Sequence, residues 1–456
     1  FSLLDKIIPV SDKIVFSSRA GNDYADNSKY LYEYFLSKNE KKIYFYTKKK
    51  TILKLIPYNG IYAYSFKGII VLLTSKYFVF THGIGDFFPY FPVKKSNRIF
   101  INLFHAISVK KIGPNKFTKA IKKEINAWDY FIVSSDFESK FIINQFGFKN
   151  IQLKVLGQSR NDLLDKAKHH SLNIKRILYA PTFRDEGELK LFPFKDLDLK
   201  ALDENLLNYK IEILIRLHIN DEKKYKLKEE FKELKNIKFE GSEIIPTINE
   251  NLYSYDVLIT DYSSIALDFL LLDRPIAYLP YDYKDYNLVR GFSFDYYKHL
   301  AGPVLTSQDD FMSFLIENND NYREVRMDKR NLFHKFEDKK SSERIYNFIK
   351  SMWSKNLMIK NTGVNITRLF LKSKKNISPN DLEKYSKDRA FIYDYDEITP
   401  GFHVKSQREM TDAINQYIKD KTIYSKERKK IKKMFHKHYD SKACDRIYKV
   451  IEGYNK

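Results

Sequence analysis

The chain of 456 residues contains one cysteine, Cys444, and several widespread catalytic motifs are missing from it. A single cysteine excludes an intrachain disulfide and a zinc site built from cysteine clusters, so a reducing compartment fits the composition best. There is no Walker A loop, no HExxH helix and no GxSxG elbow, and no GxGxxG follows the first strand-like run. These absences argue against P-loop NTPases, zinc peptidases, serine hydrolases and nicotinamide-dependent enzymes.

Long apolar runs are also missing, whereas positive charge is in excess. The longest apolar stretches, GIIVLL (68–73) and VLITDYSSIALDFLLL (257–272), are short or interrupted by polar residues, and FSLLDKIIPV (1–10) lacks the pattern of a signal peptide. The 80 Lys and Arg outnumber the 58 Asp and Glu, for a net charge of +22. The sequence therefore predicts a soluble or peripheral protein with an anionic partner: nucleic acid, an acidic membrane face or a phosphate-rich substrate.

Short β-rich runs alternate with helical patterns in two series, which predicts an α/β fold with two Rossmann-like domains facing each other across a cleft. The first series is KIVFSS (13–18), KIYFYT (42–47), YFVF (77–80), RIFINLFH (98–105) and DYFIVSS (129–135). The second series is RILYA (176–180), IEILIR (211–216), IKFEG (237–241), DVLIT (256–260) and PIAYL (275–279). The expected division is an acceptor-side domain at 1–170, a donor-binding domain at 171–352 and a basic C-terminal extension at 353–456.

An internal repeat links the end of the second domain to the extension. Residues 333–349, FHKFEDKKSSERIYNFI, match residues 435–451, FHKHYDSKACDRIYKVI, in register. We favour a packing helix as the explanation of the repeat, with a duplicated anion-binding tail as the alternative. A solenoid is excluded because two copies are too few for that architecture. The basic segment 426–440 could hold a polyanionic product or rest on an anionic inner leaflet, although a solvated helix face is the default interpretation.

The stretch ITDYSSIALDFLLLDRPIAYLP (259–280) is typical of a phosphate-binding corner. A strand-like run stops at Asp261 and continues through Ser263 and Ser264 into an apolar helical pattern, so the start of that helix could receive a phosphate. Simple helix capping by the same residues is the alternative. Three other strand-like runs also end in polar residues, in GQSRND (157–162), YAPTFRD (179–185) and LIRLH (214–218). Parallel sheets bind ligands at such carboxyl ends.

Three histidines stand out at the ends of predicted strands. His105 is followed by Lys110 and Lys111, so it suits a general base beside lysines that hold an anionic substrate. A structural role, the more common one for a lone histidine near an apolar strand, is the alternative. His82 lies in a glycine-containing loop and is either the rival base or a partner that positions the substrate. His218 follows Arg216 by two residues, and together they suit a diphosphate whose bridging bond is breaking.

The sequence requires no metal ion. Asp261 and Asp268 could hold a divalent cation, but acidic residues are not clustered around them, and Asp268 is better placed for contact with a hydroxyl group. Basic residues would then neutralise the phosphates without a metal.

In this order, the motifs resemble the CDP-glycerol glycerophosphotransferase family, the teichoic-acid and capsule polymerases with a GT-B fold. The resemblance runs from about residue 13 to 350 and includes SSRAGNDYADNSKYLYEYF (17–35), NLFHAISVKKIG (102–113), LGQSRNDLL (156–164), residues 251–279 and RGFSFDYYKHLAGP (290–303), the last of which is quite specific. It implies transfer of glycerol phosphate or ribitol phosphate from a CDP-activated donor to the terminal hydroxyl of a growing teichoic-acid-like or capsular polymer, with release of CMP. It also implies a cytoplasmic enzyme at the inner face of a bacterial membrane, with an anionic polymer as acceptor.

The same resemblance suggests roles for individual residues. The family's Trp-His-Gly-Thr block corresponds to residues 104–107, where only the proposed base, His105, is kept. His218 matches the family's second important histidine. The suggested donor contacts are Arg216, Ser263 and Ser264 on the departing CMP, Thr182 and Arg184 on the diphosphate, Pro246 and Thr247 near cytosine, and Asp268 on the ribose. Two other functions remain open at this point, namely a GT-B glycosyltransferase that uses a nucleotide sugar and a nucleic-acid-binding protein without catalytic activity.

Overall fold

The computed structural model describes residues 2–361, apart from 96, 113–116, 149–151, 167–173, 186, 227, 242–244, 246 and 318–319, together with residue 416. The chain divides into two units, Phe1–Ser354 and Lys355–Lys456. The predicted extension from 362 onward, the second repeat copy and the basic segment 426–440 therefore lie outside the described residues, as does Pro246.

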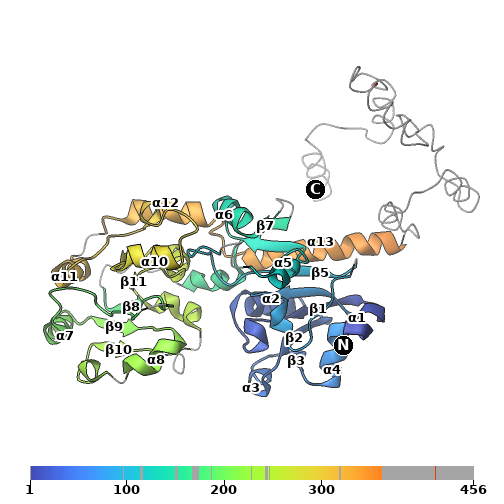
Figure 1. Cartoon of the computed structure of the whole chain (residues 1–456), viewed down its shortest axis with the longest axis horizontal. Coiled ribbons are helices and arrows are strands. Elements are labelled where there is room, and N and C mark those ends of the chain that lie inside the picture. Colours follow the sequence, from blue (N-terminus) through green and yellow to red (C-terminus); the bar gives the residue numbers. More distant parts are fainter. Residues whose placement is uncertain are drawn as a thin grey trace, which may run out of the picture. The chain divides into compact units, whose positions relative to one another are not determined.

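A seven-stranded parallel sheet forms the core of the first lobe (Figure 1, blue to teal), with the strand order β3-β2-β1-β4-β5-β6-β7. Its strands are β1 Ser11–Phe16, β2 Ile43–Thr47, β3 Gly60–Tyr62, β4 Ser75–Phe80, β5 Ile99–Asn102, β6 Tyr130–Val133 and β7 Leu153–Val155. The order reverses between β1 and β4, which is the switch point at which doubly wound sheets bind their ligands.

A five-stranded parallel sheet forms the core of the second lobe, with the order β10-β9-β8-β11-β12. Its strands are β8 Arg176–Ala180, β9 Glu212–Ile215, β10 Ile237–Phe239, β11 Val257–Thr260 and β12 Ile276–Tyr278. Here the switch point lies between β8 and β11. Two parallel sheets of this order confirm the predicted α/β architecture with two Rossmann-like halves.

Helices cover these sheets because the strands alternate between two buried faces. In β4, for example, Tyr77 and Val79 belong to one apolar core, and Phe78 and Phe80 belong to the other. The helices are α1 Ser2–Ile7, α2 Asp26–Ser37, α3 Lys50–Leu53, α4 Phe66–Thr74, α5 Lys119–Ile125, α6 Asp136–Phe146, α7 Leu199–Asn208, α8 Ile219–Lys226, α9 Ile265–Phe269, α10 Tyr283–Val289, α11 Gln308–Ile316, α12 Arg323–Phe333 and α13 Ser341–Asn361.

Helix α13 follows the second sheet in sequence but packs on the first (Figure 1, orange). Ile345 and Ile349 are buried in the same apolar core as Ile14 of β1, and the Trp353 ring lies 5.8 Å from that of Tyr77 in an edge-to-face contact. The first lobe is therefore built from two separated stretches of the chain. Residues 341–352 were predicted to belong to the domain 171–352, but in the structure their apolar side chains pack in the first lobe.

The first copy of the internal repeat has mainly packing contacts. Phe333 and Ile349 are fully buried, and the two oxygens of Asp338 accept hydrogen bonds from Arg344 Nη1 at 2.6 and 2.7 Å. The same four residue types recur in register within 435–451. For the described copy, these contacts support a packing role rather than anion binding, but the predicted helix is present only from Ser341 onward, because residues 334–340 form a loop.

Candidate active site

The two histidines predicted as rival bases lie against each other. His82 follows β4 and His105 follows β5, and these strands are neighbours in the first sheet. Their rings are stacked, with centroids 4.4 Å apart and planes inclined by 5°. The two imidazoles therefore belong to one site at the carboxyl edge of the sheet.

Hydrogen bonds fix the orientation of the His82 ring. Its Nδ1 lies 2.8 Å from Thr81 Oγ1, and that hydroxyl donates to Asp86 Oδ2 at 3.2 Å. Because the hydroxyl's one proton points to the carboxylate, it accepts from His82, so Nδ1 carries the hydrogen and Nε2 is the basic nitrogen. Asp86 is itself held by the N–H groups of Thr81 and Ala20, at 2.9 and 2.7 Å.

His105 is placed by its backbone. The preceding residue, Phe104, has a φ of +53°, a left-handed conformation that an aromatic residue seldom adopts, and its carbonyl accepts from Asn27 Nδ2 at 2.8 Å. The carbonyl of His105 accepts a hydrogen bond from Arg160. His105 Nδ1 is buried without a hydrogen-bond partner in the protein. Burial, followed by the neighbouring His82, lowers the pKa of His105 to about 3, so the ring is neutral at physiological pH.

A buried carboxylate that the sequence analysis did not single out accompanies His105. Asp26, at the start of α2, accepts from Arg19 Nε at 2.8 Å and lies 3.8 Å from Arg160 Nη1. Burial alone would raise the pKa of Asp26, but Arg19 and Arg160 outweigh it and hold the pKa below its ordinary value. The negative charge of Asp26 favours a proton on His105. Residues 26 and 160 lie in quoted motifs, yet nothing in those motifs indicates which groups they meet.

The switch point of the second sheet forms a separate polar corner. Asp261, directly after β11, accepts from the N–H of Thr182 at 2.8 Å and from Arg184 Nη2 at 2.9 Å, so the loops after β8 and β11 are tied together. Thr182 is 5% exposed, and its Oγ1 has no partner in the protein. This hydroxyl is a candidate contact for a ligand at the corner.

Arg184 is fully engaged by protein groups. Its Nε and Nη2 bind both oxygens of Asp282 at 2.6 and 2.9 Å, Nη2 also binds Asp261, and Nη1 donates to the carbonyl of Thr182 at 2.5 Å. Nearby carboxylates raise the pKa of Arg184 against the effect of burial. In this arrangement Arg184 braces the corner, and its guanidinium has little capacity left for the direct diphosphate contact expected from the sequence.

The serine pair lies at the start of a shorter helix than expected. Ser263 and Ser264 are partly buried, and α9 spans only five residues before the 3₁₀ segment Leu270–Leu272. Asp273 then ends the turn with a φ of +50°. A five-residue helix has too few aligned peptides for a strong dipole, so an anion here would be bound mainly by hydrogen bonds from serine hydroxyls and backbone N–H groups.

Arg216 and His218 follow the neighbouring strand β9. Arg216 Nη1 donates to the carbonyls of Glu240 and Ile245, at 3.2 and 2.6 Å, and thereby holds the loop that leads to Thr247. His218 is exposed, and its ring lies 5.3 Å from that of Phe183 in the loop after β8. Thr247 is partly buried and precedes the 3₁₀ segment η7, Ile248–Ser254.

The loop after His105 reaches the second lobe. Lys110 forms an antiparallel bridge with Phe292, while Lys111 N–H donates to the carbonyl of Gly291 at 3.1 Å. Burial lowers the pKa of Lys110, and the Asp261 carboxylate opposes that shift. Lys110 was predicted on the acceptor side, but it lies close enough to Asp261 to interact with the polar corner electrostatically. The side chain of Lys111 is exposed.

Asp268 lies in a buried ion-pair network between the lobes. Its oxygens accept from Arg160 Nη2 at 2.5 Å, Asn161 Nδ2 at 2.9 Å and Asn249 Nδ2 at 3.1 Å. With these three partners and 2% exposure, the carboxylate is directed at the protein rather than presented to a ribose. Both aspartates considered for a cation, Asp261 and Asp268, face arginines.

Within the described part of the chain, no three His, Cys, Asp or Glu side chains are grouped so that they could hold a metal ion. In the same residues, no helix has the length and apolar character needed to span a bilayer.

Comparison with known proteins places this geometry in a family. The chain is 27% identical over 379 residues to the teichoic acid glycerol-phosphate transferase of Staphylococcus aureus (strain NCTC 8325 / PS 47), covering 76% of this chain and 94% of that protein. It is 28% identical over 375 residues to the teichoic acid poly(ribitol-phosphate) polymerase of Bacillus spizizenii (strain ATCC 23059 / NRRL B-14472 / W23), covering 75% of this chain and 56% of that protein.

The solved structure of the wall teichoic acid polymerase TagF has the same fold, with a TM-score of 0.63 at 24% identity over 76% of this chain and 91% of that one. A family model described as CDP-glycerol:poly(glycerophosphate) glycerophosphotransferase matches residues 4–351 and 377–453, which include both lobes. The chain therefore belongs to the CDP-glycerol:poly(glycerophosphate) glycerophosphotransferase family.

Proposed function

We propose that the chain moves a polyol phosphate, glycerol phosphate or ribitol phosphate, from a CDP-activated donor to the terminal hydroxyl of a growing teichoic-acid-like or capsular polymer. The match of the family model to both lobes carries this proposal. It favours a CDP-polyol over a nucleotide sugar as donor, and an enzyme over a nucleic-acid-binding protein. The neutral His105 at the carboxyl edge of the first sheet and the polar corner around Asp261 at the switch point of the second sheet supply the two halves of such a reaction.

In the proposed reaction, His105 acts as the general base. It takes the proton of the acceptor hydroxyl while the hydroxyl oxygen attacks the phosphorus that bears the polyol. The bond from this phosphorus to the bridging oxygen breaks, and CMP leaves with that oxygen. The charge of Asp26 stabilises the imidazolium that forms, and the stacked ring of His82 holds the His105 ring in position.

The donor phosphates are assigned to the polar corner. Thr182 Oγ1, Ser263 and Ser264 offer hydroxyl contacts, and Lys110 brings positive charge from the first lobe. Arg216 and His218 complete the set by stabilising charge on the departing CMP. Positioning and electrostatic stabilisation of this kind dominate phosphoryl transfer, and removal of one contact typically costs about 10²-fold to 10³-fold in rate.

The function is tested by incubating the full chain with CDP-glycerol and with CDP-ribitol separately, each with a short polyol-phosphate acceptor. We expect CMP to be released in step with acceptor elongation for at least one donor. UDP-glucose and GDP-mannose serve as controls and should release no nucleotide. Turnover of a nucleotide sugar, without CMP from either CDP-polyol, would contradict the proposal.

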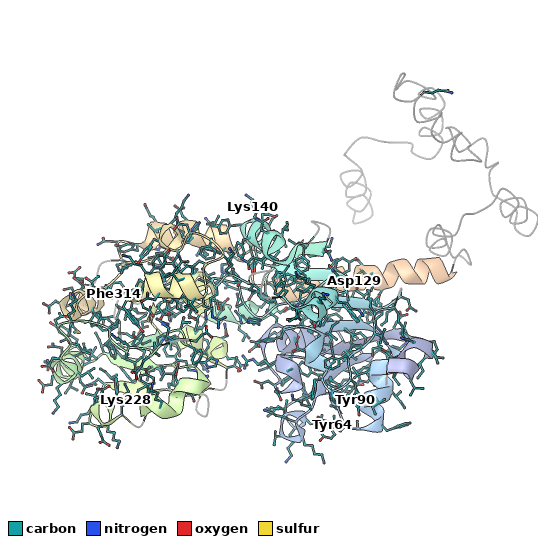
Figure 2. The ribbon with its side chains drawn as sticks, viewed as in Figure 1. Tyr64, Tyr90, Asp129, Lys140, Lys228 and Phe314 are labelled. Carbon is teal, nitrogen blue, oxygen red and sulfur yellow. The ribbon has the colours of Figure 1, made fainter. Side chains whose placement is uncertain are left out.

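We further propose that the first lobe rests on an anionic membrane through a surface defined by α3, β3 and α4. Phe66 is 80% exposed and Leu55 62% exposed, and Tyr64 projects from the edge of the lobe (Figure 2). Residues 41–85 contain no Asp or Glu, whereas Lys50 and Lys67 are exposed among these apolar side chains. Apolar groups beside lysines are typical of surfaces that bind anionic lipid headgroups.

Replacement of Phe66 by serine is expected to weaken this attachment at least several-fold, because the most exposed aromatic side chain of the surface is lost. The measurement is co-sedimentation of the full chain with vesicles of phosphatidylglycerol and phosphatidylcholine. Leu288→Ser is the matched control, since Leu288 is 85% exposed on the second lobe. Equal loss in the two variants, or equal binding to vesicles of phosphatidylcholine alone, would count against this surface.

A further inference from the structure

A cavity of about 200 Å³ lies outside the catalytic residues, where the segment after β7 meets the segment before α13. Ser134, Gly157, Gln158 and Asn161 line it from the first side, and His334 and Phe336 from the second. His334 and Phe336 belong to the first copy of the internal repeat, which the proposed transfer reaction does not use.

The walls of this cavity are held in place by direct contacts between the two segments. Asp162 accepts from the N–H groups of Ser341 and Ser342, at 2.9 and 2.7 Å, and so caps the start of α13. Gly157 has a φ of +86°, and a Cβ atom at this position would lie 2.4 Å from Ser341 Oγ. The close approach requires glycine, and it fixes the distance between the walls before any ligand binds.

Two of the residues that line this small space have buried oxygens without a partner. Gln158 and Asn161 are 4% and 7% exposed, yet Gln158 Oε1 and Asn161 Oδ1 have no hydrogen-bond partner in the protein, whereas the side chain of Ser134 interacts with that of Glu138. A buried polar group without a partner typically costs about 1–3 kcal/mol. Two such atoms on residues that line one cavity point to an occupant that satisfies them together.

The chemistry of the lining selects hydrogen-bond donors. Asn161 Nδ2 donates to Asp268, so Oδ1 is necessarily an acceptor. His334 Nε2 lies 2.8 Å from the carbonyl of Leu267 and must donate to it, which leaves Nδ1 unprotonated. Burial lowers the pKa of His334, so the ring stays neutral. The lining also contains Glu337 and Lys339, whose opposite charges give it no excess of either sign. A neutral molecule with several hydroxyl groups would satisfy the acceptors of Gln158, Asn161 and His334.

We propose that this cavity binds a small neutral polyol or a single sugar unit, separate from the donor and acceptor of the transfer reaction. Its hydroxyls donate to the oxygens of Gln158 and Asn161, and its C–H surface packs on the ring of Phe336. Asn161 and Arg160 share Asp268, and Arg160 donates to the carbonyl of His105, so the occupant contacts a network that also supports the catalytic loop.

Binding is tested on the full chain by ligand-observed NMR and calorimetry, with glycerol, ribitol and glucose as probes and glycerol 3-phosphate as the anionic comparison. A molecule with so few atoms is expected to bind with a Kd of about 1–10 mM. Gln158→Leu and Ser134→Ala should each weaken binding of the best probe at least five-fold. Gln152→Leu is the matched control, because the Gln152 amide donates to the carbonyl of Trp128 away from the cavity.

Folding is checked in the same variants. Gln158→Leu removes an acceptor without a partner, so its unfolding midpoint should equal or exceed that of the parent chain. No saturable binding of any neutral probe, or unchanged binding in both cavity variants, would overturn the proposal. Preferential binding of glycerol 3-phosphate that depends on Gln158 would also overturn it. None of these readouts requires turnover, so the result stands apart from the test of transfer activity.

Discussion

Replacement of His105 by glutamine is expected to lower turnover by about 10²-fold to 10⁴-fold, the usual contribution of a general base. Glutamine keeps much of the side-chain volume beside His82 but cannot take a proton from the acceptor hydroxyl. Since the donor corner is built from the second lobe and Lys110, donor binding should be unchanged. CMP release measures the loss of turnover, and calorimetry with the CDP-polyol measures donor affinity.

Two comparisons identify the base. His82→Gln should be less damaging than His105→Gln, because His82 acts through stacking; the reverse order would make His82 the base. Lys110→Met should weaken binding of the CDP-polyol, whereas His105→Gln should leave that binding unchanged.

The pH dependence of turnover is a further readout. His105 is neutral above its pKa of about 3, so kcat/KM should not fall through protonation of His105 between about pH 8 and pH 5. A fall centred near 6.5 in the parent chain, absent from His105→Gln, would contradict the pKa of about 3 while still identifying His105 as the base.

Replacement of Arg160 by methionine is expected to lower the free energy of unfolding by about 3–5 kcal/mol. The substitution leaves the Asp268 carboxylate buried with only the amides of Asn161 and Asn249 as donors, and the His105 carbonyl loses its partner. Urea unfolding of the full chain measures the loss. Such a loss would establish the interlobe network as a major source of stability.

The control for Arg160 is an ion pair of similar length at the surface. Lys224 lies 3.0 Å from Glu188 with both side chains more than half exposed, so Lys224→Met should cost no more than about 1 kcal/mol. Adding Asp268→Leu to Arg160→Met should recover part of the loss, because the stranded charge is removed. A cost for Arg160→Met no larger than that of the surface control would contradict the prediction.

Most of the predicted strands could be read from the sequence because they are buried runs of at least four residues, and the two shorter ones, β10 and β12, lie in longer β-rich stretches of the sequence. All ten of them occur in the two sheets, and RILYA (176–180) corresponds to β8 without any shift of its ends. The run 98–105 is shorter in the structure, where β5 ends at Asn102 and the chain turns through Phe104. Strands β3 and β7 were not predicted, since their three residues do not stand out from the neighbouring sequence as a β-rich run.

The candidate site was predictable in its residue types but not in its contacts. Strand-end polar residues pointed to His82, His105 and Asp261, because the carboxyl ends of parallel strands share an edge. The sequence could not indicate that Arg184 would form ion pairs with two carboxylates, or that Asp268 would bind Arg160 from the other lobe. In a chain rich in both charges, a buried aspartate is stabilised by whichever cation the fold brings near, and that partner is distant in sequence.

The position of α13 has a consequence for biosynthesis. Its apolar residues complete the core of the first sheet, although about 200 residues separate them from β7, the last strand of that sheet. At a ribosomal rate of about 5–20 residues per second, the emerging N-terminal sheet waits roughly 10–40 s with an uncovered apolar surface. Folding of this lobe during translation is therefore delayed by its topology, and fragments that end after Tyr278 but before Ser341 should be prone to aggregation even though every strand is present.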